Sequence, residues 1–455
     1  MSRPLAGTVI AIVGSETPSG LSELVVALGA DPLVLRDERV FARLAEAEIL
    51  GAVDTDGALA GVEVPFPVVQ MRSEPARWVA SGLAALSGPA GGSALARGPF
   101  VERLSGAGAL FQLLAATQGV PVELDVMDRL AERARIARFE GQGPTAVGGS
   151  AIMVRAADGW VALNLARPED IAALPALVER AVDPAGWPRV AAALRTRTVT
   201  ELRDQAERLG VPIGVVPPGG SIVAGAPFRF EDREASASGS GSIRNRLRPD
   251  RAIARRARPP VVVELASLWA GPLTGALLVS AGADVTKYES TERPDGARRG
   301  PAPFFDRLHS GKHFATFDHR DPADLNRLAE VLATADVVID GSRARVMEQW
   351  GIDVGRLVRS GTTWISITGH GRASARVAFG DDAAVEAGLV VPGRTANDAP
   401  TFVGDAIADP ITGLYGAVVA LAATLSPGGH LVDLSLVGAA AHAAAGTTFD
   451  AVDPT

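Results

Sequence analysis

Short apolar runs alternate with helix-periodic segments at the start of the chain. Residues 8–13 (TVIAIV) form an apolar run that predicts a strand, and residues 18–28 have the apolar spacing of a helix. Gly29 ends that helix, and the apolar residues after Asp31 begin a second strand. A strand, a helix and a strand in this order form a βαβ unit, which implies a parallel sheet.

The same pattern returns in the C-terminal half. Residues 261–265 predict a strand, residues 271–281 a helix, and the segment from Asp284 a further strand. Residues 102–117 also resemble residues 409–424 without a gap. We therefore interpret residues 1–118 as a shortened copy of residues 258–424. The alternative, that two alanine-rich helices look alike by composition, stays open.

The segment between the two copies predicts a smaller α+β domain at residues 119–232. Residues 151–154 and 160–163 flank Asp158-Gly159 and predict a hairpin. Pro168 opens a predicted helix that runs to Val182, and a second predicted helix at residues 199–209 ends at Gly210.

A different composition marks the end of this middle domain. Residues 233–257 are rich in serine and glycine and then strongly basic, without apolar periodicity, so we interpret them as a linker. Residues 258–455 then form the second βαβ-type domain. The expected fold class is α/β, a Rossmann-like parallel open sheet with a shortened N-terminal pseudo-repeat and a smaller α+β domain between.

Composition narrows the function classes. The 455 residues are 47% hydrophobic and 21% charged, as in globular proteins of more than one domain. A net charge of -8 opposes nucleic-acid binding, which needs a basic surface. No apolar run reaches the ~18 residues of a membrane span, and the first residues lack the layout of a secretory signal, so we expect a cytoplasmic protein. Cysteine is absent, and the six histidines lack ligand spacing, so no metal site is predicted.

Lysine usage singles out two positions. Of the 44 basic residues only Lys287 and Lys312 are lysine. A lysine that persists in so arginine-rich a chain suggests a requirement for a compact point charge. With two residues, chance remains the alternative.

Six segments beyond residue 258, in their order, resemble family III CoA-transferases, the group that includes formyl-CoA and carnitine CoA-transferases and methylacyl-CoA racemases. Lys287 and Lys312 fall on lysine positions of that family's motifs. The segments are VVVELASLWAGPLTGALLVSAGADVTKYE (261–289), SGKHFATFD (310–318), ADVVIDGSRARVMEQWGID (335–353), WISITGHG (364–371), GDAIADPITGLYGAVVALAAT (404–424) and HLVDLSL (430–436).

The resemblance implies acyl-CoA and carboxylic-acid substrates and no permanently bound cofactor. Family members run from a large domain to a small domain and back, whereas this chain places a second large domain last. A tandem fusion with lost pieces explains that order. It predicts either a pseudo-dimeric monomer, in which one chain supplies both halves, or a homodimer.

The resemblance also assigns a nucleophile. In the family an aspartate at the position of Asp409 attacks the thioester, and its two-step exchange replaces one hard step. We expect Pro410 to hold Asp409 in extended geometry before a helix whose free N–H groups stabilise the oxyanion. The plainer alternative is that Asp409 only caps the helix. Glu102 takes this position in the N-terminal copy, which we expect to be catalytically silent.

Residues for CoA binding follow from the same motifs. We expect Lys312 to contact a phosphate or the adenine side of CoA, with Lys287, Arg298 and Arg299 as further cations. The turn at Ala270 and Gly271 is expected to bring backbone close to the ligand at the carboxyl end of a strand.

Three departures from the family pattern leave alternatives open. The family's Asn-Phe-x-Pro-Gly turn is replaced by residues 341–345 (GSRAR), so the amide and the aromatic ring expected beside CoA are missing. Either Arg343 or Arg345 compensates for their loss, or affinity for CoA is lost. Trp269 replaces a glutamine, which favours a bulky or flat acyl group unless the ring fills core. Asp381 stands where racemases carry a histidine, so a racemase or isomerase of the same fold is weaker than a transferase. A degenerate protein that binds acyl-CoA or a partner without turnover is the third reading.

Overall fold

The computed structural model describes most of the chain. It covers residues 3–14, 18–35, 49–60, 62, 64, 66–71, 75–180, 187–218, 225–231 and 258–452. The predicted linker at residues 233–257 lies outside these ranges.

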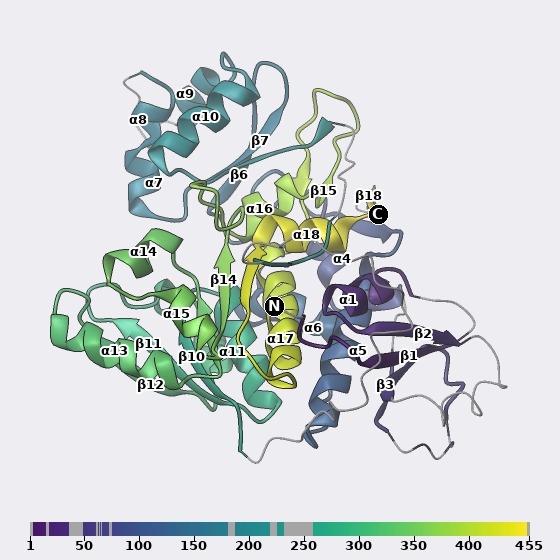
Figure 1. Cartoon of the computed structure of the whole chain (residues 1–455). Coiled ribbons are helices and arrows are strands. Elements are labelled where there is room, and N and C mark those ends of the chain that lie inside the picture. Colours follow the sequence, from purple (N-terminus) through teal and green to yellow (C-terminus); the bar gives the residue numbers. More distant parts are fainter. Residues whose placement is uncertain are drawn as a thin grey trace, which may run out of the picture.

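A seven-stranded sheet organises the C-terminal half in the order β12-β11-β10-β13-β14-β17-β9 (Figure 1). Neighbouring strands are parallel, except that β9 runs antiparallel to β17. The predicted strand and helix after residue 260 are confirmed as β10 and α11 (Ala270–Ser280). The strands are β10 (Val261–Leu265), β11 (Asp284–Ser290), β12 (His313–Phe317), β13 (Val337–Asp340), β14 (Thr363–Thr368), β17 (Leu431–Ser435) and β9 (Arg229–Phe230).

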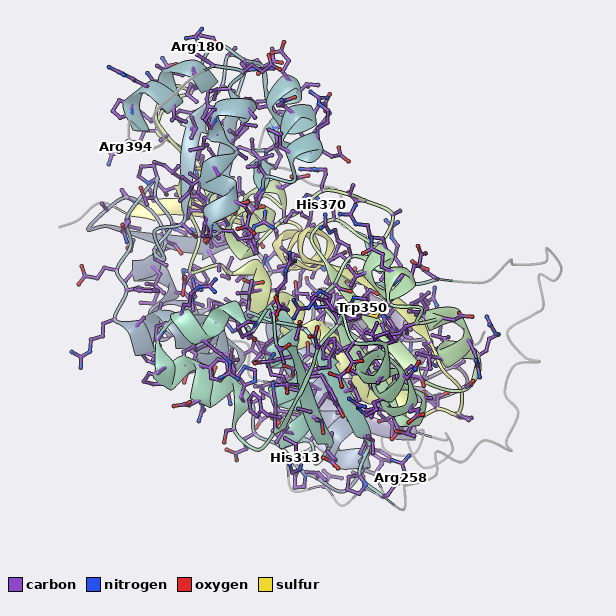
Figure 2. The ribbon with its side chains drawn as sticks, turned by 90° about the vertical axis from the view of Figure 1, so that its left-hand side faces the viewer. Arg180, Arg258, His313, Trp350, His370 and Arg394 are labelled. Atoms are coloured by element: carbon purple, nitrogen blue, oxygen red, sulfur yellow. The ribbon has the colours of Figure 1, made fainter. Side chains whose placement is uncertain are left out.

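The carboxyl ends of these strands point toward the small domain. Figure 2 shows Arg258 and His313, which lie where β10 and β12 begin, at the opposite end of the molecule from Arg180 at the tip of the small domain. His370, two residues beyond the end of β14, lies at the level between them. Ligands of open α/β sheets bind at the carboxyl edge, so the face toward the small domain is where a site is expected.

The N-terminal residues form a second, smaller parallel sheet in the order β2-β1-β3-β4. The predicted strand–helix–strand unit is confirmed as β1, α1 (Leu21–Ala27) and β2. Here β1 lies between β2 and β3, as β10 lies between β11 and β13 in the larger sheet. A duplication would give this arrangement, but the duplication itself stays a prediction. The strands are β1 (Val9–Val13), β2 (Asp31–Leu35), β3 (Ile49–Asp54) and β4 (Val68–Gln70).

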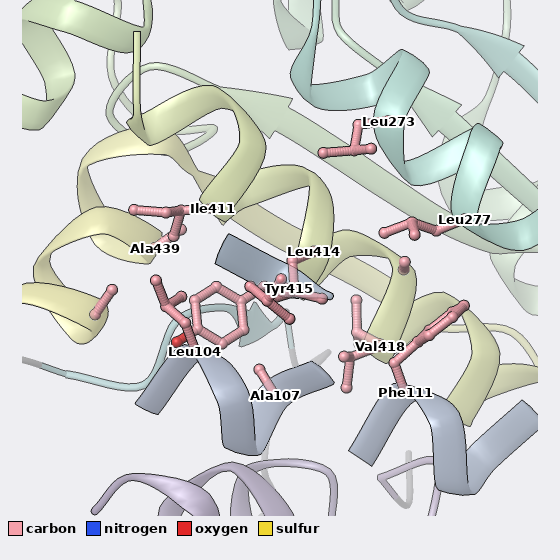
Figure 3. Packing of buried hydrophobic residues seen from close by; sticks show 14 of the residues in the cluster. Leu104, Ala107, Phe111, Leu273, Leu277, Ile411, Leu414, Tyr415, Val418 and Ala439 are labelled. Atoms are coloured by element: carbon pink, nitrogen blue, oxygen red, sulfur yellow. The ribbon is translucent and has the colours of Figure 1, made fainter. Parts of the chain in front are cut away.

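The two halves share one hydrophobic core built around helix α17 (Ala408–Thr424), which packs against α11 and α5 (Phe100–Thr117) (Figure 3). Gly413 and Gly416 allow the close approach to α11. A Cβ at Gly413 would lie 2.8 Å from the Ala270 carbonyl oxygen, and one at Gly416 would lie 2.5 Å from the Thr274 hydroxyl. The helices that the predicted duplication would pair, α5 and α17, therefore meet in a single core.

The middle region contains a small domain with its own core. A three-stranded antiparallel sheet, β6-β7-β8, confirms the predicted hairpin, and α10 (Val199–Leu209) confirms the helix ending at Gly210. The single helix predicted from Pro168 to Val182 is wrong. It is split into α7 (Pro168–Ala172) and α8 (Leu174–Leu177), because Pro175 has no N–H to donate to Ile171. The strands are β6 (Ala151–Arg155), β7 (Trp160–Asn164) and β8 (Ile213–Val215).

Two further elements tie the regions together. Helix α6 (Val126–Ala137) contributes to the main core and contacts α5 and α12 (Ala302–His309), although it falls within the segment predicted to be the small domain. Strand β18 (Thr448–Val452) pairs antiparallel with β5 (Ser93–Arg97), so the end of the described chain returns to the N-terminal half.

Candidate active site

Asp409 lies in the first turn of α17, where its side chain is partly exposed between buried neighbours. It is the second residue of the helix and Ile407 is the N-cap, so the capping alternative does not hold. The expectation that Pro410 keeps Asp409 extended is also wrong. The Asp409 N–H donates to the Ala406 carbonyl at 2.9 Å, and this turn holds Asp409 in helical geometry despite the proline that follows.

A second helix, α16 (Gly380–Glu386), begins against the same carboxylate. The backbone N–H of Gly380 lies close enough to Asp409 to help lower the pKa of its carboxyl. A Cβ at position 380 would lie 2.5 Å from Asp409 Oδ2 and 2.3 Å from the Ala406 carbonyl oxygen. Position 380 therefore has to be glycine for the backbone to approach the acid so closely.

The turn before α17 is strained and clamped. Ala406 has φ 42°, a left-handed conformation that costs a non-glycine residue roughly 1–3 kcal/mol. The buried carboxylate of Asp381 holds the turn by accepting the Ala406 N–H at 2.9 Å. A second strained residue, Leu268 (φ 71°), lies just after β10 and is 39% exposed. Such strain collects at functional sites.

Arg133, from α6, brings a cation into this group. Its Nε donates to Asp405 Oδ2 at 2.7 Å and its Nη2 donates to Asp405 Oδ1, a bidentate pair with a fully buried carboxylate. The guanidinium stacks 5.1 Å from the centre of the Trp269 ring. Trp269 is itself buried and packs edge-on against Phe304.

Two carboxyl groups here, those of Asp409 and Asp381, have a raised pKa. Burial raises the pKa of Asp409 to about 7, against the pull of Arg133 and with the help of the neighbouring Asp381 and Asp405. Burial, aided by Asp405, likewise raises the pKa of Asp381 to about 6. Burial acts to lower the pKa of Arg133, but Asp405 outweighs it and the pKa is raised, so the guanidinium stays charged. Near pH 7 the group holds carboxyls able to act as nucleophile, acid or base.

Asp382 links this group to the small domain. Asn164, at the end of β7, donates from its side-chain amide to Asp382 Oδ1 at 2.9 Å, and both residues are buried. Burial raises the pKa of Asp382 to about 8, so it is a neutral acid at pH 7.

Both lysines lie in a buried ion network, with side chains that are 0% exposed. The Nζ atom of Lys312 lies 2.7 Å from Glu264 Oε2 and donates to the Pro272 carbonyl at 2.8 Å. The Nζ atom of Lys287 lies 2.9 Å from Asp295 and 3.2 Å from Glu264. In this arrangement neither ammonium reaches solvent, and a role for either lysine in CoA binding stays a prediction.

The pKa shifts of the two lysines differ in direction. Burial acts to lower the pKa of Lys287, but Glu264 and Asp295 outweigh it and the pKa is raised. For Lys312 burial outweighs Glu264, and the pKa is lowered. Among the described residues Lys287 contacts two carboxylates, whereas Lys312 contacts Glu264 alone and is also repelled by Lys287.

The other residues expected to bind CoA are dispersed. Arg298 pairs with Glu289 and stacks 4.4 Å from the Phe305 ring centre, and Arg299 is exposed. Gly271 is buried, and a Cβ there would lie 2.1 Å from the Ala266 Cβ. The close packing of α11 against the residue that follows β10 therefore explains why position 271 is a glycine. The Ala270 carbonyl accepts the Thr274 hydroxyl.

An arginine group lies at the carboxyl edge of the sheet. Arg343 and Arg345 are exposed just after β13, and no ion pair to either occurs among the described residues. Burial, together with the nearby charges of Arg345, Arg167 and Arg293, lowers the pKa of Arg343. Four cations from three parts of the chain thus converge on one region.

Arg133 and Asp405 are functional candidates that sequence reasoning missed. Arg133 lies outside every segment that resembles the family, so no motif points to it. Asp405 lies four residues before Asp409 within a quoted segment, and its charge in an otherwise small and apolar run is a usable signal. Within the described part of the chain, no cluster of His, Asp or Glu could hold a metal ion, and no helix is long and apolar enough to cross a membrane.

Comparison with known proteins places these residues in a family. Residues 260–454 match CoA-transferase family III. This part of the chain belongs to that family. The matched part contains Asp409, Asp381 and Asp405, whereas Arg133 and Asn164 lie outside it.

Individual relatives match over limited lengths. The succinate–glutarate CoA-transferase of Agrobacterium fabrum is 29% identical over 206 residues, which are 40% of this chain and 52% of the relative. The succinyl-CoA–D-citramalate CoA-transferase of Chloroflexus aurantiacus is 26% identical over 191 residues, 38% and 48% of the two chains. A CaiB/BaiF family protein from Brucella suis, of known structure, is 28% identical over 41% of this chain and 55% of its own, with a TM-score of 0.38. The chain spans about half the length of the curated relatives it matches.

Proposed function

We propose that this protein transfers CoA between carboxylic acids, with Asp409 as the nucleophile. One observation carries the proposal. The carboxyl of Asp409 lies in the matched family region and is partly exposed, and burial brings its pKa to about 7. The Asp409 carboxyl is therefore ionised in part near neutral pH, and it is only partly hydrated.

The reaction balances without an external oxidant or metal. A carboxylate oxygen of Asp409 attacks the thioester carbonyl and the C–S bond breaks, so that CoA leaves as a thiolate and an aspartyl-acyl mixed anhydride remains. The thiolate attacks the Asp409 carbonyl carbon, which gives an aspartyl-CoA thioester and releases the first acid. The second acid then repeats these two steps in reverse and carries CoA away. The Gly380 N–H, aimed at Asp409, is placed to stabilise negative charge on its carboxyl oxygens.

The arginine group supports binding of the CoA phosphates. Arg343, Arg345 and Arg293 are exposed at the carboxyl edge of the parallel sheet, and their mutual repulsion would be relieved by an anion. We assign the phosphates to these residues, in place of the buried Lys287 and Lys312. The curated relatives are named for exchanges among succinate, glutarate and D-citramalate, and only the reaction class is extended from them to this chain.

We also propose that the N-terminal copy is silent. Its counterpart of Asp409, Glu102, accepts the Ser19 N–H at 2.7 Å and so caps the entry to α1. One competent site per chain then follows from the fusion of the two halves.

Intact-mass analysis tests the function directly. The protein is mixed with a panel of acyl-CoAs and analysed before and after hydroxylamine treatment. Transfer chemistry predicts a covalent acyl or CoA adduct that hydroxylamine removes, that is absent in Asp409→Asn, and that persists in Asp306→Asn, a control at an exposed aspartate of α12. An adduct that survives in Asp409→Asn refutes the assignment. CoA binding without any adduct favours the silent binder.

A second function, racemisation or isomerisation of an acyl-CoA, is favoured by Asp381. It lies beside Asp409 and also has a raised pKa, so two acid/base groups are present. Incubation of acyl-CoA in deuterated water separates the two. Incorporation of deuterium at the α-carbon that depends on Asp381 and Asp409 indicates racemisation, and CoA exchange without incorporation indicates transfer.

A further inference from the structure

We propose that Arg133, through its bidentate pair with Asp405, is a positioning residue that aims Asp409 and favours its ionised form. The inference rests on the proposed function for its consequence, but the geometry is independent of it. Arg133 comes from α6, upstream of the region that matches the family. Residues outside the family region would therefore complete the active site.

The first argument is mechanical. Asp405 and Asp409 flank one tight turn, in which Ala406 is held at φ 42°. The turn is fixed at one point by Arg133 on Asp405 and at the next by Asp381 on the Ala406 N–H. Without the arginine, the buried Asp405 would lose its only described ion-pair partner and the strained turn would lose one of its two anchors.

The second argument concerns the position of Arg133 itself. Its guanidinium stacks on Trp269 and lies 6.0 Å from the Phe139 ring centre. Gly148 closes the remaining side, because a Cβ there would come within 3.1 Å of Arg133 Nη2. A side chain held on several sides is preorganised, so its charge acts on Asp409 from a fixed place.

The third argument is the charge count around Asp409. The charged groups that face it are Arg133 from α6, Asp381 from α16, and Asp405 from the preceding turn, with the Gly380 N–H as a dipole. One cation thus serves three carboxylates. Removing the cation should hinder ionisation of Asp409, and removing Asp405 should ease it.

The opposite pKa changes expected from removing Arg133 and from removing Asp405 test the positioning role. The pKa of Asp409 is measured by NMR on protein labelled with carboxyl-¹³C aspartate, with its resonance assigned by its loss in Asp409→Asn. We expect Arg133→Met to raise the pKa by about one unit or more and Asp405→Asn to lower it by a similar amount. The double variant should return close to the wild-type value, and Arg133→Lys, which keeps the charge, should stay closer to wild type than Arg133→Met.

The two proposals fail in different ways. The pH profile of adduct formation should move with the measured pKa, so that Arg133→Met reacts about tenfold more slowly at pH 6. Shifts of the same sign in both single variants, or no shift in either, would overturn the positioning role even if adducts form. The expected pKa shifts without adducts in any variant would overturn the transferase proposal alone. If Arg133→Met does not fold, the double variant, which buries no unpaired charge, still tests the sign, because the pKa of Asp409 in it should lie above that in Asp405→Asn.

Discussion

Replacing Lys312 with methionine separates two roles for this ammonium group. In the structure Lys312 neutralises Glu264 inside a buried set of four charges, two lysines against Glu264 and Asp295. Methionine keeps most of the side-chain volume and removes the charge. The set then has a net charge of -1 in a buried position.

The expected loss is large. Removing one partner of a buried pair costs roughly 3–5 kcal/mol, because the remaining charge is left uncompensated. For a domain of this size that corresponds to a decrease in melting temperature of roughly 6–20 °C. The double variant Glu264→Gln/Lys312→Met leaves Lys287 with Asp295 and should recover at least half of the loss.

Thermal unfolding followed by circular dichroism, together with calorimetric titration of CoA, is the assay. If Lys312→Met melts within about 2 °C of wild type but binds CoA at least tenfold more weakly, the ammonium group contributes to CoA binding. The buried network then does not explain why a lysine occupies position 312. A lower melting temperature that the double variant partly restores supports the network.

Three further outcomes follow from the packing and the charges. Gly416→Ala should cost about 1–3 kcal/mol by overpacking against Thr274, despite a gain of about 1 kcal/mol in helix propensity, whereas Gly225→Ala, with open space around it, should not; urea unfolding compares the two. Because the pKa of Asp382 is raised when folded, its contribution to stability is present at low pH and is lost as pH rises toward about 8. Asp382→Asn should therefore flatten the decline in melting temperature between about pH 4 and about pH 8, and an unchanged decline would contradict the shift. Arg343→Ala/Arg345→Ala should weaken CoA binding at least about tenfold and reduce its salt dependence, unlike Arg356→Ala on α15 (Val354–Arg359); calorimetry at two salt concentrations decides.

Local patterns predicted the strands and helices of the two parallel sheets well, whereas the chemistry of Asp409 stays a prediction. The βαβ units were predictable because apolar period and glycine stops are properties of neighbouring residues. Asp409 could be placed at a helix start, but its helical backbone could not, because the turn depends on Asp381, 28 residues earlier. The break between α7 and α8 is also encoded locally, because Pro175 lacks the N–H that a continuous helix needs.

Contacts between segments that are distant in the sequence could not be predicted from local patterns. The burial of Lys287 depends on Asp295 and on Glu264, which lies opposite it in the neighbouring strand. The sequence shows Glu264 as a charged residue within an apolar strand, but it does not show that Lys287 is its partner. Arg133 reaches Asp405 across 272 residues, and no local signal encodes such a meeting.

The pairing of β5 with β18 has a consequence for the order of folding. Arg97 meets Asp450 across 353 residues, and Phe449 packs with Trp78 and Phe100. At ribosomal rates of about 5–20 residues per second, β5 waits roughly 20–70 seconds for its partner strand. During that time an unpaired strand edge and two large aromatic rings lack their final cover. The N-terminal half therefore cannot complete its folding as it leaves the ribosome, and the nascent chain should depend on chaperones until β18 is made.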